Sequence, residues 1–387
     1  MPRVEDWEHG GFGLYIHWPF CQAKCPYCDF NSHVVAHVDQ KAWENAYLSE
    51  IERIGAETSG RVLRSVFFGG GTPSLMDPDV VDAVISKVRA TWPLANDVEI
   101  TLEANPTSVE AGRFRGYHDA GVNRVSMGIQ ALNDADLKAL GRLHSTAEAL
   151  QAFDIARNTF DRVSFDLIYA RQEQSVEAWQ AELKQALSMA IDHLSLYQLT
   201  IEGGTAFGDR YTAGKLRGLP DDDGAADMYA VTQQVCGDAG LLGYEVSNHA
   251  WPGSESIHNK IYWQYGDYAG IGPGAHGRLT LDGQRFATET PLAPMRWLAQ
   301  VSRTGNGEAG RMALRDEDQM AEFLLMGLRL VDGVSLDRFP KLLSIPYINK
   351  INDLCDIGVV AFDGRQLRAT DEGRPILNAI LRKLLEG

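Results

Sequence analysis

The amino-terminal half of the chain alternates between short segments rich in β-branched and aromatic residues and longer segments with apolar residues three and four positions apart. The short segments predict strands at residues 12–18, 65–68, 98–104, 124–129, 163–169 and 193–200. The longer segments predict helices at residues 40–54, 77–91, 109–120, 134–140, 146–158 and 176–189. Because a helix follows each strand, we expect an α/β fold in which a parallel sheet curls into a partial (β/α)6 barrel. Ligands of such barrels bind at the carboxyl ends of the strands.

Beyond residue 200 the pattern changes. Residues 201–223, rich in Gly, Pro and Asp, predict a long surface loop or lid. A helix, a short strand and a Gly/aromatic stretch without helical periodicity are expected at residues 225–239, 242–247 and 251–277. Further helices and a hairpin predict a mainly helical, winged-helix-like carboxyl-terminal module, with helices at 316–330, 346–355 and 371–385 and the hairpin at 359–369. We therefore divide the chain into residues 1–210, 211–310 and 311–387.

Charge and hydropathy exclude several classes of protein. Lys and Arg number 36 against 52 Asp and Glu, a net charge of −16, which argues against binding nucleic acid. Charged residues interrupt every apolar run well before about 18 residues, so no transmembrane span is expected. The acidic start, residues 1–9, has no apolar core of a secretory signal. A cytoplasmic location is expected.

Three cysteines, Cys21, Cys25 and Cys28, have the spacing C-x3-C-x2-C directly after the first predicted strand. Structural zinc usually takes four ligands, and His17 or His33 would have to supply the fourth. Three thiolates on one loop suit three irons of a [4Fe–4S] cluster and leave the fourth iron open to a cofactor. The cluster is the favoured hypothesis, with zinc and an inert trio as alternatives. The other two cysteines, Cys236 and Cys355, are interpreted as buried apolar residues.

With this motif in place, the chain resembles the radical SAM superfamily, whose members use S-adenosylmethionine (SAM). It is most similar to the branch that contains oxygen-independent coproporphyrinogen III oxidase and the haem chaperone HemW. The resemblance extends from about Leu14 to the carboxyl-terminal module. It implies a radical-SAM-type barrel with a [4Fe–4S] cluster and SAM as cofactors.

The resemblance also implies SAM contacts at matching positions. Successive glycines let a ligand approach the backbone, and the run Gly69-Gly70-Gly71-Thr72-Pro73 follows the second predicted strand. Polar side chains at or near the other strand ends would complete the ring, with Arg142 as a partner of the SAM carboxylate. The implied SAM contacts are Tyr15, Gly70, Gly71, Thr72, Glu103, Gln130, Arg142, Asp166 and Thr200.

Two loops depart from the family pattern. Ala170-Arg171-Gln172 stands where the family usually has Gly-Leu-Pro, and Glu202-Gly203-Gly204-Thr205 stands where it has Glu-Pro-Gly-Thr. Both changes concern loop geometry rather than the binding of the cluster or SAM.

Two features separate the haem-carrier branch from the oxidase. The oxidase has a further cysteine where this chain has Phe30, and it has a long segment ahead of its cluster where only twenty residues precede Cys21. The run His258-Asn259-Lys260-Ile261-Tyr262-Trp263 matches the HNxxYW motif of the haem chaperone. Neutral imidazole is a good haem ligand, so His258 is expected to bind haem, with His276 as the next candidate. Considered without the resemblance, the motif would more often be a loop packed by aromatic residues.

The resulting hypothesis is a protein that binds haem, a [4Fe–4S] cluster and SAM and delivers haem to acceptor proteins. The alternative is a radical SAM enzyme, either a coproporphyrinogen III oxidase-type decarboxylase or a methyltransferase, and an inactive scaffold is disfavoured by the intact motifs. The sequence leaves open whether SAM is turned over. A flavodoxin or ferredoxin as electron donor and a homodimer are further hypotheses that the sequence does not decide.

Overall fold

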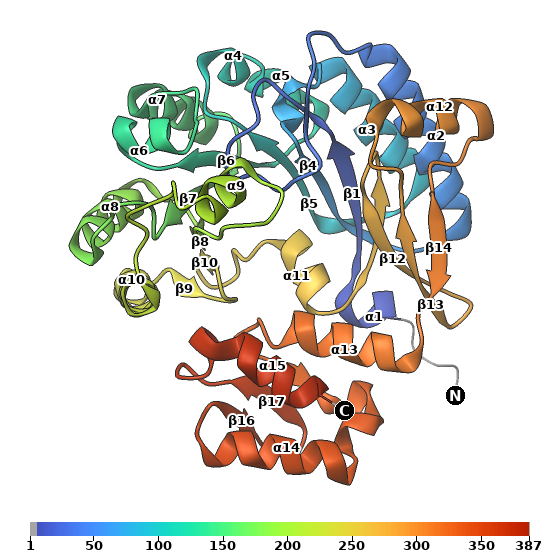
Figure 1. Ribbon diagram of the computed structural model, residues 1–387. Coiled ribbons are helices and arrows are strands. Elements are labelled where there is room, and N and C mark those ends of the chain that lie inside the picture. Colours follow the sequence, from blue (N-terminus) through green and yellow to red (C-terminus); the bar gives the residue numbers. More distant parts are fainter. Residues whose placement is uncertain (1–5, 387) are drawn as a thin grey trace.

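The computed structural model describes residues 6–386 and contains one curved twelve-stranded sheet (Figure 1). Residues 1–5, part of the segment predicted not to be a secretory signal, lie outside the described residues. The six predicted strands are present, pair in parallel and follow the order of the chain. They are β1 (Phe12–Trp18), β4 (Leu63–Gly70), β5 (Leu94–Ala104), β6 (Arg124–Gln130), β7 (Arg162–Tyr169) and β8 (His193–Gln198).

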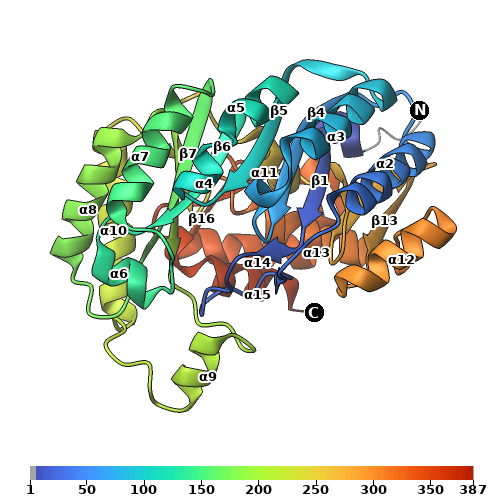
Figure 2. The same ribbon diagram turned by 90° about the horizontal axis from the view of Figure 1, so that it is seen from above.

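The predicted helices cover the outer face of these strands as a continuous layer (Figure 2). Local capping fixes where several of them begin; at Ser145, for example, a capping box with Glu148 starts α7 (Thr146–Arg157). The predicted segment 109–120 is divided in two. The remaining helices of this layer are α2 (Gln40–Glu57), α3 (Pro78–Thr91), α4 (Ser108–Ala111), α5 (Phe114–Ala120), α6 (Asp134–Ala139) and α8 (Val176–Met189).

Additional strands extend the sheet at both edges without closing it. β11 (Asp267–Ile271) lies parallel to β1, and three antiparallel strands continue from it: β12 (His276–Leu281), β13 (Gln284–Glu289) and β14 (Gly310–Ala313). At the other edge, β10 (Asn248–Ala250) pairs with β8 and with β9 (Leu242–Gly243). The partial (β/α)6 barrel is therefore confirmed. The strand predicted at residues 242–247 is wrong in extent, because only 242–243 form a strand, β9, and a bend at 244–247 precedes β10.

Helices occur in segments for which the sequence indicated none, including two that were expected to be irregular. The predicted loop or lid contains α9 (Ala206–Thr212), which projects from the body of the protein (Figure 2). The Gly/aromatic stretch contains α11 (Ile257–Trp263), so the expectation of no helix there is wrong. The carboxylate of Glu99 accepts hydrogen bonds from the backbone of Ile257 and His258 at the start of α11. This buried anion stabilises a helix that is too short to show periodicity. The other helices of this region are α10 (Asp222–Asp238) and α12 (Pro294–Thr304).

The carboxyl-terminal module has its own apolar core, built around Phe323, Leu336, Leu354 and Ile380. The predicted hairpin is present as β16 and β17, and the short strand β15 joins it in a three-stranded sheet. The elements are α13 (Asp316–Gly327), β15 (Val334–Ser335), α14 (Ile345–Asp356), β16 (Val360–Phe362), β17 (Gln366–Ala369) and α15 (Leu377–Leu385). Within residues 6–386, no helix has the length and apolar character needed to cross a membrane.

Candidate functional site

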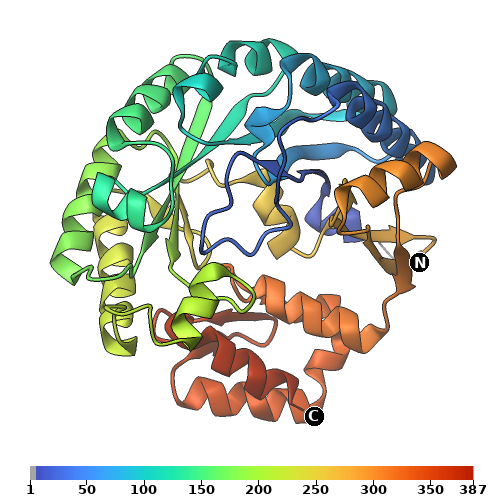
Figure 3. The same ribbon diagram turned by 45° about the horizontal axis from the view of Figure 1, so that its top comes forward.

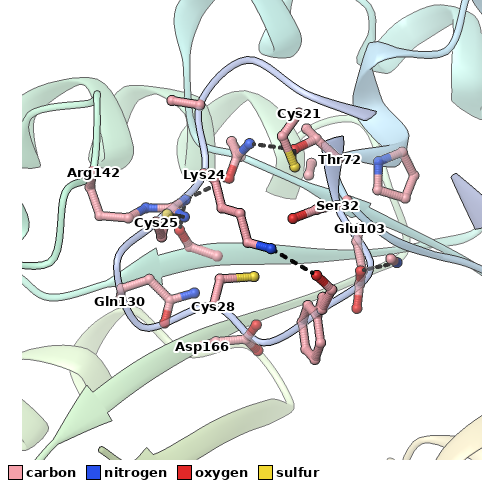
Figure 4. A pocket seen from close by; sticks show the side chains of 18 of the residues that line it. Cys21, Lys24, Cys25, Cys28, Ser32, Thr72, Glu103, Gln130, Arg142 and Asp166 are labelled. Atoms are coloured by element: carbon pink, nitrogen blue, oxygen red, sulfur yellow. Dashed lines mark hydrogen bonds between the residues drawn. The ribbon is translucent and has the colours of Figure 1, made fainter. Parts of the chain in front are cut away.

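The cysteine loop lies over the carboxyl ends of the barrel strands. It leaves β2 (Phe20–Cys21) and returns in β3 (His33–Val34), which pairs with β2 in parallel. This dark blue segment occupies the middle of the ring of helices in Figure 3. The thiols of Cys21, Cys25 and Cys28 line one cavity of about 140 Å³. Most of the predicted SAM contacts line the same cavity (Figure 4): Gly70, Gly71, Thr72, Glu103, Gln130, Arg142 and Asp166.

The surroundings of the thiols suit a metal cluster. The Thr72 hydroxyl donates to Cys21 Sγ at 3.3 Å, and Arg142 Nη1 donates to Cys25 Sγ at 3.4 Å. Removal from water raises the pKa of the Cys21 and Cys28 thiols, so binding a metal would have to displace their protons. Across residues 6–386, no three or more His, Cys, Asp or Glu side chains are arranged around a single-ion position. Three thiols that line one cavity would suit three irons of a cluster, with the fourth iron left open to a cofactor.

The glycine run joins the ends of β4 and β1. Gly70 has φ +111°, a conformation that glycine adopts without strain, and its amide donates to Glu103 Oε2 at 3.2 Å. A Cβ atom on Gly70 would lie 2.5 Å from the His17 ring, and one on Gly71 would lie 2.7 Å from the Phe20 carbonyl oxygen. Neither position has room for a side chain. These glycines therefore let the start of the cysteine loop pack closely against the end of β4.

Two carboxyl groups face the cavity from β5 and β7. Removal from water raises the pKa of Glu103 to about 8, with a further contribution from nearby Asp166. The same cause raises the pKa of Asp166 to about 6, whereas Ser195 and the charges of Arg124 and Arg142 lower it. An ammonium group bound here would favour both ionised forms. The pair therefore suits the positively charged amino group of SAM.

These pKa shifts predict how the ligand-free protein responds to pH. Because the folded state disfavours the ionised Glu103 carboxyl, stability should fall as pH rises from its ordinary value, 4.5, to about 8. Glu103→Gln should therefore flatten the decline of the thermal unfolding midpoint over that interval. Asp166→Asn, the matched control, should flatten it only from 3.8 to about 6. An unchanged slope in Glu103→Gln would contradict the assignment.

Arg142 is held at the cavity by the protein and keeps one donor unused. Its Nη2 donates to Asn105 Oδ1 at 2.5 Å and to the Gly128 carbonyl oxygen at 2.8 Å. Its buried Nε–H has no hydrogen-bond partner in the part of the chain that the structure describes. A buried donor without a partner costs free energy, and a carboxylate could satisfy it. The predicted contact with the SAM carboxylate fits this geometry. Next to it, Gln130 has φ +75°, a strained conformation often found at binding sites.

The loop after β7, where the sequence departs from the family, supports this side of the cavity. Ala170 has φ +57°, which explains why glycine is usual there. Buried Arg171 forms ion pairs with Asp136 and with Glu182, both at 2.6 Å. Glu182 in turn accepts a hydrogen bond from the Leu132 amide. Arg171 thus holds the segment that follows Gln130, and sequence analysis did not identify this role.

Three of the four HNxxYW residues, His258, Asn259 and Tyr262, line one cavity next to the cysteine cavity, and Trp263 does not. His258 is only 2% exposed, and its Nδ1 and Nε2 lie 2.8 Å from Ser65 Oγ and 3.1 Å from the Tyr262 hydroxyl. Its ring stacks on Phe67, and burial lowers its pKa to about 3. Trp263 instead lines a different cavity, between the barrel and the carboxyl-terminal module. Iron ligation by His258 stays a prediction, and it would require breaking one of these hydrogen bonds.

The two remaining predicted contacts lie at the margins of the site. Tyr15 lines two cavities next to the cysteine cavity, and its hydroxyl is 3.0 Å from His17 Nδ1. Thr200 is exposed beyond β8 and is not among the residues that line these cavities. Sequence analysis missed Asn105, which follows β5 and accepts a hydrogen bond from Arg142. It also missed Asn31, which follows Phe30 and contacts His17 and His33.

Comparison with known proteins identifies the family. The sequence profile of the Radical SAM superfamily matches residues 15–185, and that of the HemN C-terminal domain matches residues 314–376. The chain is 41% identical to mouse "Radical S-adenosyl methionine domain-containing protein 1, mitochondrial" over 384 residues, covering 96% of this chain and 87% of that protein. It is 36% identical to "Heme chaperone HemW" of Escherichia coli over 382 residues, covering 96% and 97% of the two chains.

A solved structure supports the fold. Coproporphyrinogen III oxidase (HemN) from Escherichia coli, described as a radical SAM enzyme, superposes with a TM-score of 0.80 over 97% of this chain and 90% of its own. At 21% identity this likeness concerns the fold alone. The relatives of higher identity are matched over 96% of this chain, and the two profiles include the cysteine loop and most of the carboxyl-terminal module. The chain therefore belongs to the HemW family of the radical SAM superfamily.

Proposed function

We propose that the protein is a haem chaperone, which binds haem and delivers it to acceptor proteins while holding a [4Fe–4S] cluster and SAM. The observation that carries this proposal is the 36% identity to "Heme chaperone HemW" of Escherichia coli, with nearly complete coverage of both chains. "Heme chaperone HemW" of Haemophilus influenzae, 34% identical, gives the same support. The HNxxYW run from His258 to Trp263 agrees with it.

The residues of the cysteine cavity have separate tasks in this proposal. Cys21, Cys25 and Cys28 hold the cluster, which when bound can supply an electron to SAM. Arg142 offers its unused Nε–H to the SAM carboxylate, and Glu103 and Asp166 face the SAM amino group. Gly70 and Gly71 let the end of β4 pack against His17 and Phe20, where a side chain has no room. This arrangement binds and orients SAM whether or not SAM is consumed.

The competing function is oxidative decarboxylation of a porphyrinogen, since an oxidase shares the fold. Against it stands Phe30, whose side chain is 58% exposed at the position that holds a further cysteine in the oxidase branch. Phenylalanine can neither transfer a proton nor ligate a metal. It can, however, provide apolar contact to a flat ring.

The experiment is anaerobic reconstitution with iron and sulfide, followed by incubation with SAM, a reductant and either haem or coproporphyrinogen III. We expect haem to be retained with a Soret band, then lost to the apo form of a haem-binding acceptor, and no protoporphyrinogen to form. The triple variant of Cys21, Cys25 and Cys28 serves as the cluster-free control. Multiple turnovers of coproporphyrinogen III, with no haem retained, would contradict the proposed chaperone function and support the decarboxylase.

The partners and location follow as parts of the same proposal. Haem-requiring proteins are the acceptors, a flavodoxin or ferredoxin is the electron donor, and the protein acts in the cytoplasm, alone or as a homodimer. Relatives from mouse and cattle are described as mitochondrial, so the fold by itself does not determine the cellular location. Size-exclusion chromatography with and without haem would decide between monomer and homodimer.

A further inference from the structure

The histidines of the chain differ sharply in their access to a haem iron. An axial ligand needs a ring nitrogen that is free and can reach a flat ring at the surface. Five of the ten histidines are buried: His17, His144, His193, His249 and His258. Of these, His17 and His258 have both ring nitrogens within hydrogen-bond distance of the protein. The candidates therefore lie among the more accessible histidines.

His276 is exposed at the start of β12, on the wall of a second cavity of about 310 Å³. No hydrogen bond to its ring occurs within residues 6–386, so the ring nitrogen that carries no hydrogen is free to coordinate a metal. The cavity adjoins the cysteine cavity, since Phe30, Gly70 and Glu103 line both. Its walls are unusually aromatic, with Tyr15, Phe30, Tyr262 and Tyr268. Aromatic rings pack well on a porphyrin face.

The turn that carries His276 is held by the cysteine loop. The Asn31 side-chain amide donates to the carbonyl oxygens of Pro273 and Leu292, both at 2.9 Å. Gly274 has φ +79°, and a Cβ atom there would lie 2.5 Å from Asn31 Nδ2. The turn is thus fixed before any ligand arrives, which lowers the entropic cost of binding. Leu292, 65% exposed beside this turn, adds apolar surface near the cavity.

The HNxxYW motif forms part of the same cavity in another way. Tyr262 lines it, and the Tyr262 hydroxyl lies 3.1 Å from His258 Nε2. His258 is fixed from the other side by Ser65 and by stacking on Phe67. His258 therefore positions Tyr262, which is part of the cavity wall, and is not itself among the residues that line this cavity. This explains how a buried histidine can matter for a surface ligand.

We propose that His276 is an axial ligand of the haem iron and that the porphyrin ring packs against the aromatic cavity of Phe30, Tyr262 and Tyr268. The inference rests on the proposed haem-chaperone function and deepens it. A neutral imidazole nitrogen donates its lone pair to the iron, so the step is coordination without electron transfer. His258 is a positioning residue in this site.

The test is a haem titration of the reconstituted protein, followed by the position of the Soret band. We expect His276→Ala to shift the band and weaken binding about tenfold or more, the loss of roughly 1.4 kcal/mol. Added imidazole should restore the parent spectrum of His276→Ala, since it supplies the missing nitrogen donor. His37→Ala, an exposed histidine outside the cavity, is the matched control and should behave as the parent.

A second variant separates ligand from positioning residue. His258→Phe keeps a ring stacked on Phe67 but removes the partner of Tyr262, so haem should bind more weakly with the Soret position of the parent. The inference is overturned if His276→Ala matches the parent in both affinity and spectrum, or if only His258→Phe shifts the band. A parent protein that binds no haem at all would instead overturn the proposed function itself. The two failures are therefore distinguishable.

Discussion

Replacing any one of Cys21, Cys25 and Cys28 by alanine is expected to remove most of the iron and acid-labile sulfide that the parent protein retains after reconstitution. The three thiols line one cavity, and its wall offers no other cysteine or histidine. A [4Fe–4S] cluster that loses one of its three thiolate ligands is held much more weakly, and we expect it to be lost during reconstitution. Iron and sulfide analysis, with the visible absorption spectrum, measures the effect. The loss should be nearly complete in the triple variant.

The control for this experiment is Cys355→Ala. Cys355 lies in the carboxyl-terminal module, and its pKa is raised by burial first and by the nearby Asp356 charge second. This variant should keep the full iron and sulfide content of the parent. A triple variant that still held a complete cluster would rule out the loop as the cluster site. Stoichiometric zinc without sulfide in the parent would restore the zinc alternative.

The second large effect is expected at Gly70. Valine there would have to adopt φ +111° and would bring its Cβ atom within 2.5 Å of the His17 ring. The end of β4 must then move, together with the backbone that faces the SAM site. We expect Gly70→Val to weaken SAM binding by about a hundredfold or more, which corresponds to roughly 2.7 kcal/mol or more. Calorimetric titration of the reconstituted protein with SAM gives the affinity.

Gly60→Val separates this effect from backbone strain in general. Gly60 has φ +82°, yet nothing lies within 4 Å of a Cβ atom placed on it. The control should lose some thermal stability because of its backbone conformation and keep the SAM affinity of the parent. Unchanged SAM affinity in Gly70→Val, with iron content intact in both variants, would place the ligand away from the glycine run.

The barrel and much of its site could be predicted from the sequence because parallel strands impose order. Six strands linked by helices must place their carboxyl ends at one edge, so residues far apart in the chain, such as Cys21, Glu103 and Asp166, meet there. The glycine run could also be recognised from the sequence, because a local steric requirement selects glycine there. At Gly70 and Gly71 a side chain has no room, and no other residue type would serve.

The parts that could not be predicted depend on long-range contacts. The helix α11 is stabilised at its start by Glu99, which lies more than 150 residues earlier in the chain. The same contact draws His258 into the core, whereas the motif alone indicated an accessible ligand. The strands β12 to β14 extend a sheet edge that their own sequence does not reveal. The support that Arg171 gives through Glu182 needs the folded arrangement of β7 and α8 to be seen.

The position of Asn31 has a thermodynamic consequence. This residue follows the last cluster cysteine by three positions, contacts His17 and His33, and also holds the turn before His276. Whatever orders the cysteine loop therefore changes the free energy of the turn, and linkage makes that influence reciprocal. If loading the cluster strengthens haem binding by some factor, haem must strengthen cluster retention by the same factor. Under the proposed function, loss of the cluster under oxygen would then weaken haem binding by that same factor.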